Sequence, residues 1–292
     1  MTVFCLGSIN IDRVYRLPHL PQAGETLAAN NHSQGLGGKG INQSIAALRA
    51  GAQVVHIGAI GQNDVWIEGE LTRHGVTLDA IARVQEGTGH AIVAVDDAGE
   101  NQIIIASGAN LAQSVDAIET ALSAAKPGDT LLLQNETSHQ VEAAKLARAL
   151  GMKVFYSAAP FAQEPLQAVL PFATHILLNA VEAEALVQAT GTALADLPVE
   201  AVIVTRGSQR AEWISAGLEP LFVPSFRVQP VDTTGAGDCF AGSLAAALDQ
   251  GSPHREAMRY AAAAAAIQVT RHGTADAMPT RSEVTDFLAA QE

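Results

Sequence analysis

Cysteine is scarce in this sequence, and long apolar segments are missing. Its 292 residues include two cysteines, Cys5 and Cys239, which lie far apart along the chain. Disulfide frameworks and zinc sites need cysteines clustered at short spacing, so we expect two reduced thiols. The longest wholly apolar stretch, residues 261–267, has seven residues, far fewer than the roughly 20 needed to cross a bilayer. The N-terminus has no basic region followed by an apolar signal core. The sequence therefore predicts a cytoplasmic protein with no membrane partner.

Basic residues are also in the minority. The chain carries 17 Lys and Arg residues against 30 Asp and Glu residues, a net charge of −13, and no cluster of basic residues. Counter-ion release, which drives nucleic-acid binding, therefore has no evident source, and we expect no nucleic-acid partner. The hydrophobic content of 48% is ample for a packed core. We expect one large domain spanning residues 1–292.

Short apolar runs alternate with segments compatible with helices. Such alternation predicts a mostly parallel β-sheet covered by helices on both faces. The expected strands are residues 3–6, 54–60, 130–134, 153–156, 176–178 and 201–205. The expected helices are residues 41–49, 139–150, 181–189, 237–248, 256–269 and a terminal helix near 282–290.

Two regions outside this alternation predict a smaller β-structure. Residues 26–34 are polar and extended, and residues 90–95 and 102–105 form a hairpin pattern around a polar, glycine-containing loop at 96–101. The apolar face of such a hairpin needs cover. The mouth of an active site, a second subunit and the body of the domain are all candidates for that cover.

Gly35-Leu36-Gly37-Gly38-Lys39-Gly40 matches the G-x-G-x-x-G pattern of dinucleotide-binding proteins. That fingerprint must follow a buried strand, whereas the residues before it here are polar. A Walker A loop is also excluded, because Lys39 is followed by glycine. We interpret the segment as a glycine-rich approach to a helix that begins near Ile41, with Lys39 and Asn42 on its first turn. A plain tight turn is the alternative.

A more specific motif is Asp232-Thr233-Thr234-Gly235-Ala236-Gly237-Asp238, which directly precedes an apolar helical segment. Backbone N–H groups at a helix N-terminus can cradle an anion. A carboxylate at Asp238 would repel that anion unless it has a further role, and a general base for an attacking hydroxyl is such a role. The alternative is an acidic residue that simply stabilises the helix dipole.

Polar side chains follow several of the expected strands. Asn10 and Asp12 follow the first, Glu136 follows the strand at 130–134, and Asn179 and Glu182 follow the strand at 176–178. Open α/β sheets bind ligands at the carboxyl ends of their strands. These residues therefore predict a shared site at one edge of the sheet, although a helix cap would also explain Asn179.

Taken together, these motifs resemble the ribokinase family of sugar kinases. The matching segments, in the family's order, are residues 7–12, 37–43, 107–110, 179–182 and 232–238, and the similarity runs from Val3 to the C-terminal helix. The resemblance implies a three-layer ribokinase-like α/β fold with a β-sheet lid from about residues 13–36 and 88–107. It also implies ATP as phosphoryl donor, Mg²⁺, K⁺ as a monovalent activator, and a homodimer joined through the lids. The expected reaction is phosphorylation of a primary hydroxyl of a pentose, D-ribose to D-ribose 5-phosphate above all.

The resemblance also implies roles for individual residues. Asp238 matches the base, and Gly235, Ala236 and Gly237 match the anion-binding turn. The sugar contacts are Asn10, Asp12, Gly38, Lys39, Asn42, Glu136 and Asp238. The nucleotide and magnesium group comprises Asn179, Glu182, Thr205, Gly207, Ser208 and Gly237. A potassium site would use Asp232 and Thr234, with backbone carbonyls near Gln268, Arg271 and Gly273.

The sequence departs from the family pattern at several positions. The nucleotide turn at residues 205–210 contains arginine where a second glycine is common, which leaves nucleotide preference open. Ala277 stands where a hydroxyl would support the monovalent-ion loop, and only ten residues, 191–200, occupy a place where many relatives have a helix. Alternative functions are a kinase of fructose, of a 2-keto-3-deoxy sugar acid or of a nucleoside, a non-catalytic sugar-binding regulator, and a nicotinamide-dependent dehydrogenase.

Overall fold

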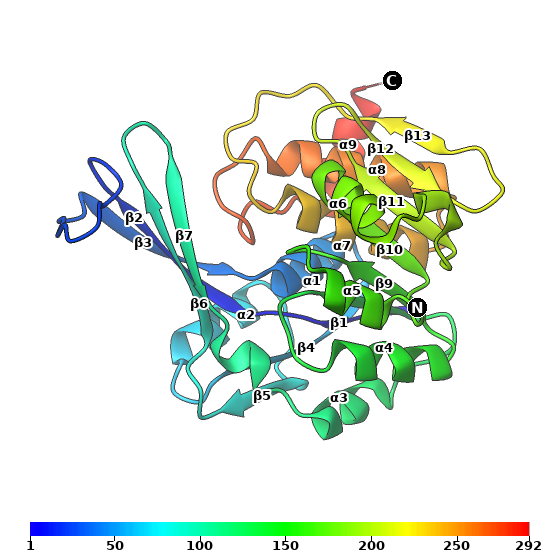
Figure 1. Cartoon of the computed structure of the whole chain (residues 1–292), viewed down its shortest axis with the longest axis horizontal. Helices are drawn as coiled ribbons and strands as arrows, with labels where there is room; N and C mark the ends of the chain where they lie inside the picture. Colours follow the sequence, from blue (N-terminus) through cyan, green and yellow to red (C-terminus); the bar gives the residue numbers. More distant parts are fainter. Residues whose placement is uncertain (292) are drawn as a thin grey trace.

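The computed structural model describes residues 1–291 and is built around a nine-stranded sheet (Figure 1). Its strand order is β13-β12-β11-β10-β9-β8-β1-β4-β5. The strands are β1 (Thr2–Leu6), β4 (Gln53–Gly61), β5 (Ile81–Val84), β8 (Thr130–Gln134), β9 (Lys153–Ser157), β10 (His175–Asn179), β11 (Ala201–Thr205), β12 (Arg210–Ile214) and β13 (Leu221–Pro224). The pairs from β5 to β11 are parallel, whereas β12 and β13 pair in antiparallel fashion.

Helices cover both faces of this sheet, which explains why its strands are continuous apolar runs. On β8, Leu131 and Leu133 pack into one core and Leu132 packs into the other. The first core is closed by α3 (Val115–Leu122), α4 (Gln140–Ala149), α5 (Gln163–Val169) and α6 (Ala180–Thr190). The opposite side is closed by α1 (Lys39–Arg49), α2 (Val65–Arg73), α7 (Ala236–Asp249), α8 (His254–Gln268) and α9 (Arg281–Ala289). The expected three-layer α/β fold is confirmed.

Helices α1 and α7 approach each other closely at Gly242. A Cβ atom on this residue would lie 2.1 Å from the backbone oxygen of Gln43. Since both helices begin at the carboxyl edge of the sheet, this contact helps to set the distance between their N-termini. Both N-termini carry predicted site residues.

A second, four-stranded sheet projects from the body of the protein (Figure 1). Its order is β3-β2-β6-β7, with β2 (Asn10–Arg16), β3 (Asn31–Gly37), β6 (Gly89–Val95) and β7 (Asn101–Ala106). We call these four strands the lid sheet. The β6–β7 hairpin confirms the hairpin expected from the sequence. Extended structure was expected from residue 26, but β3 begins only at Asn31.

Three further expectations concern local structure. Between α6 and β11 the chain forms only a short 3₁₀ turn, Leu194–Asp196, in agreement with the short or absent helix expected at residues 191–200. Cys5 and Cys239 are both buried and free. Among residues 1–291, none of the helices combines the length and the apolar character needed to span a bilayer.

Candidate active site

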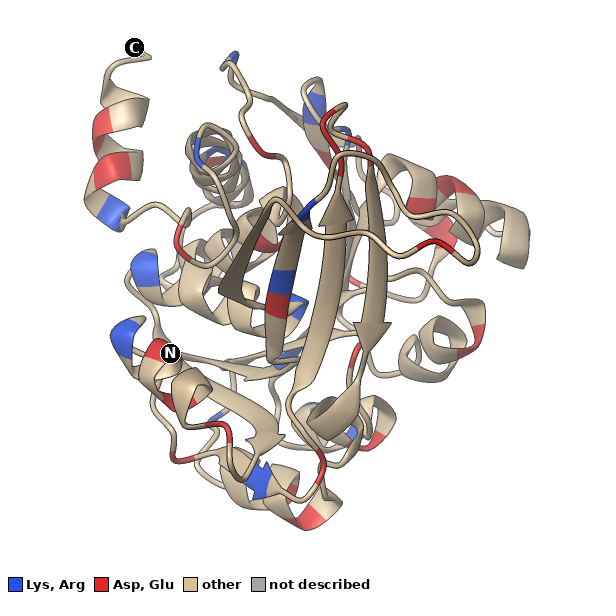
Figure 2. Cartoon of the chain, turned by 90° about the vertical axis from the view of Figure 1, so that its left-hand side faces the viewer, with Lys and Arg blue, Asp and Glu red and all other residues tan. Residues whose placement is uncertain are grey.

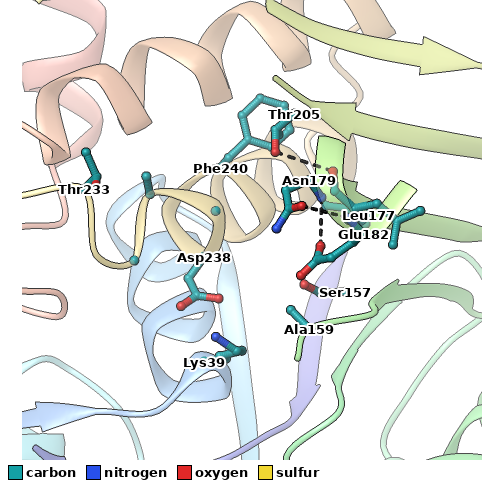
Figure 3. A pocket seen from close by; sticks show the side chains of 14 residues that line it. Lys39, Ser157, Ala159, Leu177, Asn179, Glu182, Thr205, Thr233, Asp238 and Phe240 are labelled. Atoms are coloured by element: carbon teal, nitrogen blue, oxygen red, sulfur yellow. Dashed lines mark hydrogen bonds between the residues drawn. The ribbon is translucent and has the colours of Figure 1, made fainter. Parts of the chain in front are cut away.

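A pocket opens at the carboxyl edge of the main sheet (Figure 3). The ends of β9, β10 and β11 form one wall, and the N-termini of α1 and α7 form the other. Its lining includes Lys39, Asn179, Glu182, Thr205, Thr233, Gly235, Ala236, Gly237, Asp238 and Phe240. Eight of the residues predicted from the sequence for the sugar, nucleotide or catalytic group therefore share one cavity: Lys39, Asn179, Glu182, Thr205, Gly235, Ala236, Gly237 and Asp238.

Asp238 lies on the first turn of α7 with its side chain facing Lys39 (Figure 3). The residue is 8% exposed. Gln43 donates a hydrogen bond to its Oδ1 at 3.0 Å, and Asn42 donates one to its Oδ2 at 3.3 Å. Burial raises the pKa of Asp238 to about 6, although Lys39 and the two amides act in the opposite direction. A carboxyl group with this pKa is ionised at neutral pH yet binds a proton readily, as a general base must.

The orientation of Gln43 depends in turn on Gln134, the last residue of β8. Gln134 donates a hydrogen bond from Nε2 to Oε1 of Gln43 at 2.8 Å. With its oxygen engaged in this way, Gln43 presents its Nε2 to Asp238. Both glutamines are fully buried. Neither was predicted as a site residue.

The anion cradle expected before α7 is present. Gly235 caps the helix with φ 79°, a left-handed conformation that glycine adopts without strain. Gly235, Ala236 and Gly237 line the pocket next to Asp238. The first N–H groups of a helix have no partners within the helix, and the helix dipole adds positive potential there. This wall of the pocket is suited to bind phosphoryl oxygens.

Asn179 and Glu182 face this cradle from the opposite wall (Figure 3). They also form a capping box: Glu182 N–H donates to Asn179 Oδ1 at 2.9 Å, and Asn179 N–H donates to Glu182 Oε2 at 2.8 Å. The cap and the site interpretations of Asn179 are therefore compatible. Burial raises the pKa of Glu182, against the effects of the Asn179 N–H and Lys39.

Lys39 carries the positive charge that both the predicted sugar contacts and the predicted nucleotide contacts face. Burial opposes its charge, but four carboxylates, those of Asp238, Glu136, Glu182 and Asp12, outweigh this and raise the pKa of Lys39. Its Nζ lies 3.9 Å from Oε1 of Glu136. A permanent positive charge at this position favours a phosphoryl group between the two walls.

The predicted sugar contacts gather where the lid sheet meets the body. Glu136 Oε2 accepts hydrogen bonds from the Lys39 N–H at 3.1 Å and from the Ser8 hydroxyl. Asp12, on β2, interacts electrostatically with Glu136 and Lys39, and burial raises its pKa to about 6. Asn42, on the first turn of α1, connects this group to Asp238. Gly38 caps α1 beside it.

Asn10 is held by a residue that the sequence motif contained but to which no role was assigned. Asn110 donates from Nδ2 to Asn10 Oδ1 at 2.7 Å and accepts from the Ile9 N–H at 2.9 Å. Both asparagines are buried. Asn110 therefore fixes the Asn10 amide with its nitrogen available to a ligand.

The nucleotide turn is only partly in the pocket. Thr205 lines the cavity, whereas Gly207 and Ser208 lie on the exposed turn beyond it, between β11 and β12. Arg206 and Arg210, the arginines of this turn, both donate to Oε1 of Glu212 at 2.7 Å. These two contacts connect the turn to Glu212 on β12 and so stabilise its conformation.

The loop expected to bind K⁺ does not have the expected donor set. Asp232 Oδ1 accepts from the Thr234 N–H at 2.9 Å, and its Oδ2 accepts from the Gly273 N–H at 3.1 Å. The Gln268 side chain, not its carbonyl, enters the loop, and the Gln268 carbonyl accepts from the Arg271 N–H. The guanidinium group of Arg271 pairs with Glu283 and donates to the Ala277 carbonyl oxygen. A monovalent cation does not fit this arrangement.

A divalent ion fits the pocket only together with a ligand. Within residues 1–291, no three or more His, Cys, Asp or Glu side chains are grouped to hold a metal by themselves. Asn179 and Glu182 offer oxygen atoms, the donors that Mg²⁺ prefers. Mg²⁺ is usually bound through one or two carboxylates and substrate phosphates, and the half-buried carboxylate of Glu182 in the pocket wall suits that role.

Comparisons with known proteins agree with this geometry. The pfkB family of carbohydrate kinases matches residues 2–281. A ribokinase of Haemophilus influenzae is 36% identical over 98% of both chains. Solved structures of two further ribokinases are similar. The Thermotoga maritima structure is 33% identical, covers 99% of both chains and has a TM-score of 0.89. That of Arabidopsis thaliana, complexed with ribose and ATP, is 28% identical, covers 98% of both chains and has a TM-score of 0.86. With a buried carboxylate at an anion-binding helix end and this likeness over nearly its whole length, the chain belongs to the pfkB family of carbohydrate kinases.

Proposed function

We propose that this protein transfers the γ-phosphate of ATP to the primary hydroxyl of D-ribose, giving D-ribose 5-phosphate and ADP. The observation that carries the proposal is Asp238, a buried carboxylate next to the anion cradle of α7. The likeness to ribokinases, one of them complexed with ribose and ATP, supports ribose as the acceptor and ATP as the donor.

Asp238 receives the proton of the attacking hydroxyl. As the new O–P bond forms, the proton passes to a carboxylate oxygen, the bond between the γ-phosphorus and the bridging oxygen breaks, and its electron pair leaves with ADP. Phosphoryl transfer depends mainly on positioning and on electrostatic stabilisation. N–H groups of Gly235 and Gly237 stabilise charge on the transferred group, and Lys39, at the N-terminus of α1 in the same wall, adds its positive charge. The Ala236 N–H donates to the Thr233 carbonyl oxygen at 3.3 Å.

The acceptor sugar lies between Asp238 and the lid sheet. Asn10, Asp12, Asn42 and Glu136 supply amide and carboxylate groups suited to hydroxyl recognition, with Gly38 and Lys39 at the same edge. Asn10 and Asp12 belong to β2, a strand of the lid sheet. Movement of the lid sheet would therefore reach the sugar directly and would exclude water from the transfer.

The nucleotide lies along β10 and β11. Asn179, Glu182, Thr205 and Gly237 contact its phosphates, and Gly207 and Ser208 extend the site along the outer turn. When bound there with the nucleotide, Mg²⁺ would neutralise phosphate charge, held by Glu182 and Asn179 directly or through water.

We also propose a homodimer in which the lid sheets meet. On β7, Ile103, Ile104 and Ile105 are 55%, 66% and 58% exposed. Exposed apolar side chains on an edge strand favour association. Two free cysteines suit a reducing compartment, which supports a cytoplasmic location.

The test is ADP release measured with D-ribose, D-fructose, a 2-keto-3-deoxy sugar acid and a nucleoside. We expect the highest kcat/KM with D-ribose, and a phosphorus-coupled NMR spectrum should place the product phosphate on C5. Asp238→Asn should lower kcat by roughly 10²- to 10⁴-fold while ribose binding measured by calorimetry persists. A higher kcat/KM with another acceptor would show that this acceptor, and not ribose, is the substrate. Ribose binding without ADP release would indicate a non-catalytic regulator.

A further inference from the structure

The loops beside the anion cradle are held together by two side chains, the half-buried Asp232 and the buried Gln268. Asp232 accepts the N–H groups of Thr234 and Gly273, as described above. Gln268, the last residue of α8, completes the set from the other side. Its Nε2 donates to the carbonyl oxygen of Thr234 at 2.8 Å and to that of Gly273 at 3.2 Å.

The Gln268 side chain is held only through its nitrogen. The residue is fully buried, and within residues 1–291 its Oε1 has no hydrogen-bond partner. Rotating the amide by 180° would place Oε1 against two carbonyl oxygens, so the donor orientation is fixed by these carbonyls. A buried polar atom without a partner is costly, and its presence indicates that the position of Nε2 matters more than that of Oε1.

Converging carbonyl oxygens are the usual environment of a bound monovalent cation. Here the same kind of environment surrounds a neutral N–H₂ group. Ala277 offers no side-chain oxygen, because its side chain is a methyl group, and its backbone carbonyl accepts from Arg271. We propose that the Gln268 amide takes the place of a monovalent cation in this enzyme, so that phosphoryl transfer needs no K⁺.

The amide acts on the anion cradle through one peptide unit. In a trans peptide the C=O and N–H groups point in opposite directions. Holding the Thr234 oxygen on Gln268 therefore turns the N–H of Gly235 the other way, and Gly235 is part of the pocket lining. Gln268 does not line the pocket and is a positioning residue.

The inference is tested by two measurements, ADP release and melting temperature, and only the first depends on the proposed function. ADP release with ribose is measured at equal ionic strength in KCl and in N-methyl-D-glucamine chloride. The melting temperature is measured in the same two salts and needs no activity. For the wild-type protein we expect the same rate and the same melting temperature in both. A severalfold higher rate in KCl, or a melting temperature raised by KCl alone, would overturn the inference.

Two variants sharpen the test. Gln268→Ala opens the space between the two carbonyls, and we expect it to lose activity by about tenfold or more in the organic salt and to regain activity and melting temperature in KCl. Gln268→Leu fills the space without a donor, so KCl should not rescue it. Wild-type activity of Gln268→Ala without K⁺ would show that the amide does not position the cradle. If neither salt supports any ribose-dependent ADP release, the proposed function fails, and the melting temperatures still decide this inference.

Discussion

Asp238 must be ionised to accept a proton, and this sets the pH dependence of the reaction. Its pKa is raised to about 6, chiefly by burial. A raised pKa means that the carboxyl group is largely protonated at pH 5 and largely ionised at pH 7. We therefore expect kcat/KM for ribose to increase between these values and to level off above them. A rate that stays constant down to pH 5 would contradict the assignment of the base.

Gln43 should tune this profile without contacting the substrate. Its hydrogen bond to Asp238 favours the ionised form. Gln43→Leu removes it, so the pKa of Asp238 should increase and the acid limb of the rate profile should move up by about one pH unit. The plateau rate should change less than the midpoint. An unchanged midpoint would show that Gln43 only fills space.

Asp12 offers a separate test of the sugar side of the site. Asp12→Ala removes a carboxylate at the base of the lid sheet, and hydrogen bonds to charged groups contribute about 1.5 to 3 kcal/mol. KM for ribose should therefore rise roughly tenfold to a hundredfold, with a smaller effect on kcat. Arg16→Ala, at an exposed position at the far end of the same strand, is the matched control and should leave KM unchanged. Equal KM values in both variants would remove Asp12 from the sugar site.

How far the elements could be predicted depends on how local their signals are. The bounds of β8 and β11 match the expected strands, because both are uninterrupted apolar runs buried on two faces. The residue pattern did not predict strand β2, since its sequence mixes Asn, Asp and Arg with apolar residues, and only the family resemblance placed residues 13–36 in the lid. Its stability comes from pairing with β3 and β6, and β6 lies far along the chain. Pairing of this kind leaves no local pattern.

The site shows the same division. Asn179, Glu136 and Asp238 were predictable because polar residues at strand ends and helix starts have a general meaning in α/β folds. Gln43, Gln134 and Asn110 act through contacts between distant segments, and their sequence neighbourhoods do not reveal them. For Gln268 the sequence predicted a backbone carbonyl facing the loop, whereas the structure brings its side-chain nitrogen there, because the direction of the side chain depends on the packing of α8.

The contact between α1 and α7 provides a prediction about packing. Gly242→Ala places a methyl group against the Gln43 carbonyl, and overpacking of this kind costs typically about 1 to 3 kcal/mol. Since Gln43 and Asp238 sit on these two helices, kcat should fall together with the melting temperature. Gly69→Ala is the matched control, because Gly69 lies at an exposed position of α2 and no atoms lie near the added methyl group. It should stabilise the protein by about 0.5 to 1 kcal/mol. A stable, fully active Gly242→Ala variant would show that the helices can separate without cost.

The protein as a whole has an asymmetric surface. Figure 2 shows the lid sheet with few charged residues on the face toward the viewer, although the chain carries an excess of acidic residues. On β7, Ile103, Ile104 and Ile105 are exposed, and the β6–β7 turn beside them carries Asp96, Asp97 and Glu100. An exposed apolar strand next to a charged turn is typical of a protein interface, in which an apolar centre is bordered by polar residues.

The lid sheet therefore predicts the oligomeric state. Ile104→Lys introduces a charge on the exposed face of β7, where Ile104 is 66% exposed. If two copies meet through this sheet, the variant should sediment as a monomer under conditions in which the wild-type protein is a dimer, because an unpaired buried charge is costly. Leu218→Lys is the matched control, since Leu218 is 71% exposed in the loop between β12 and β13, and it should remain dimeric. Sedimentation velocity distinguishes these outcomes, and a wild-type protein that is monomeric at all concentrations would refute the dimer.

If dimers form, the Ile104→Lys monomer should also bind ribose more weakly, because Asn10 and Asp12 belong to the same sheet.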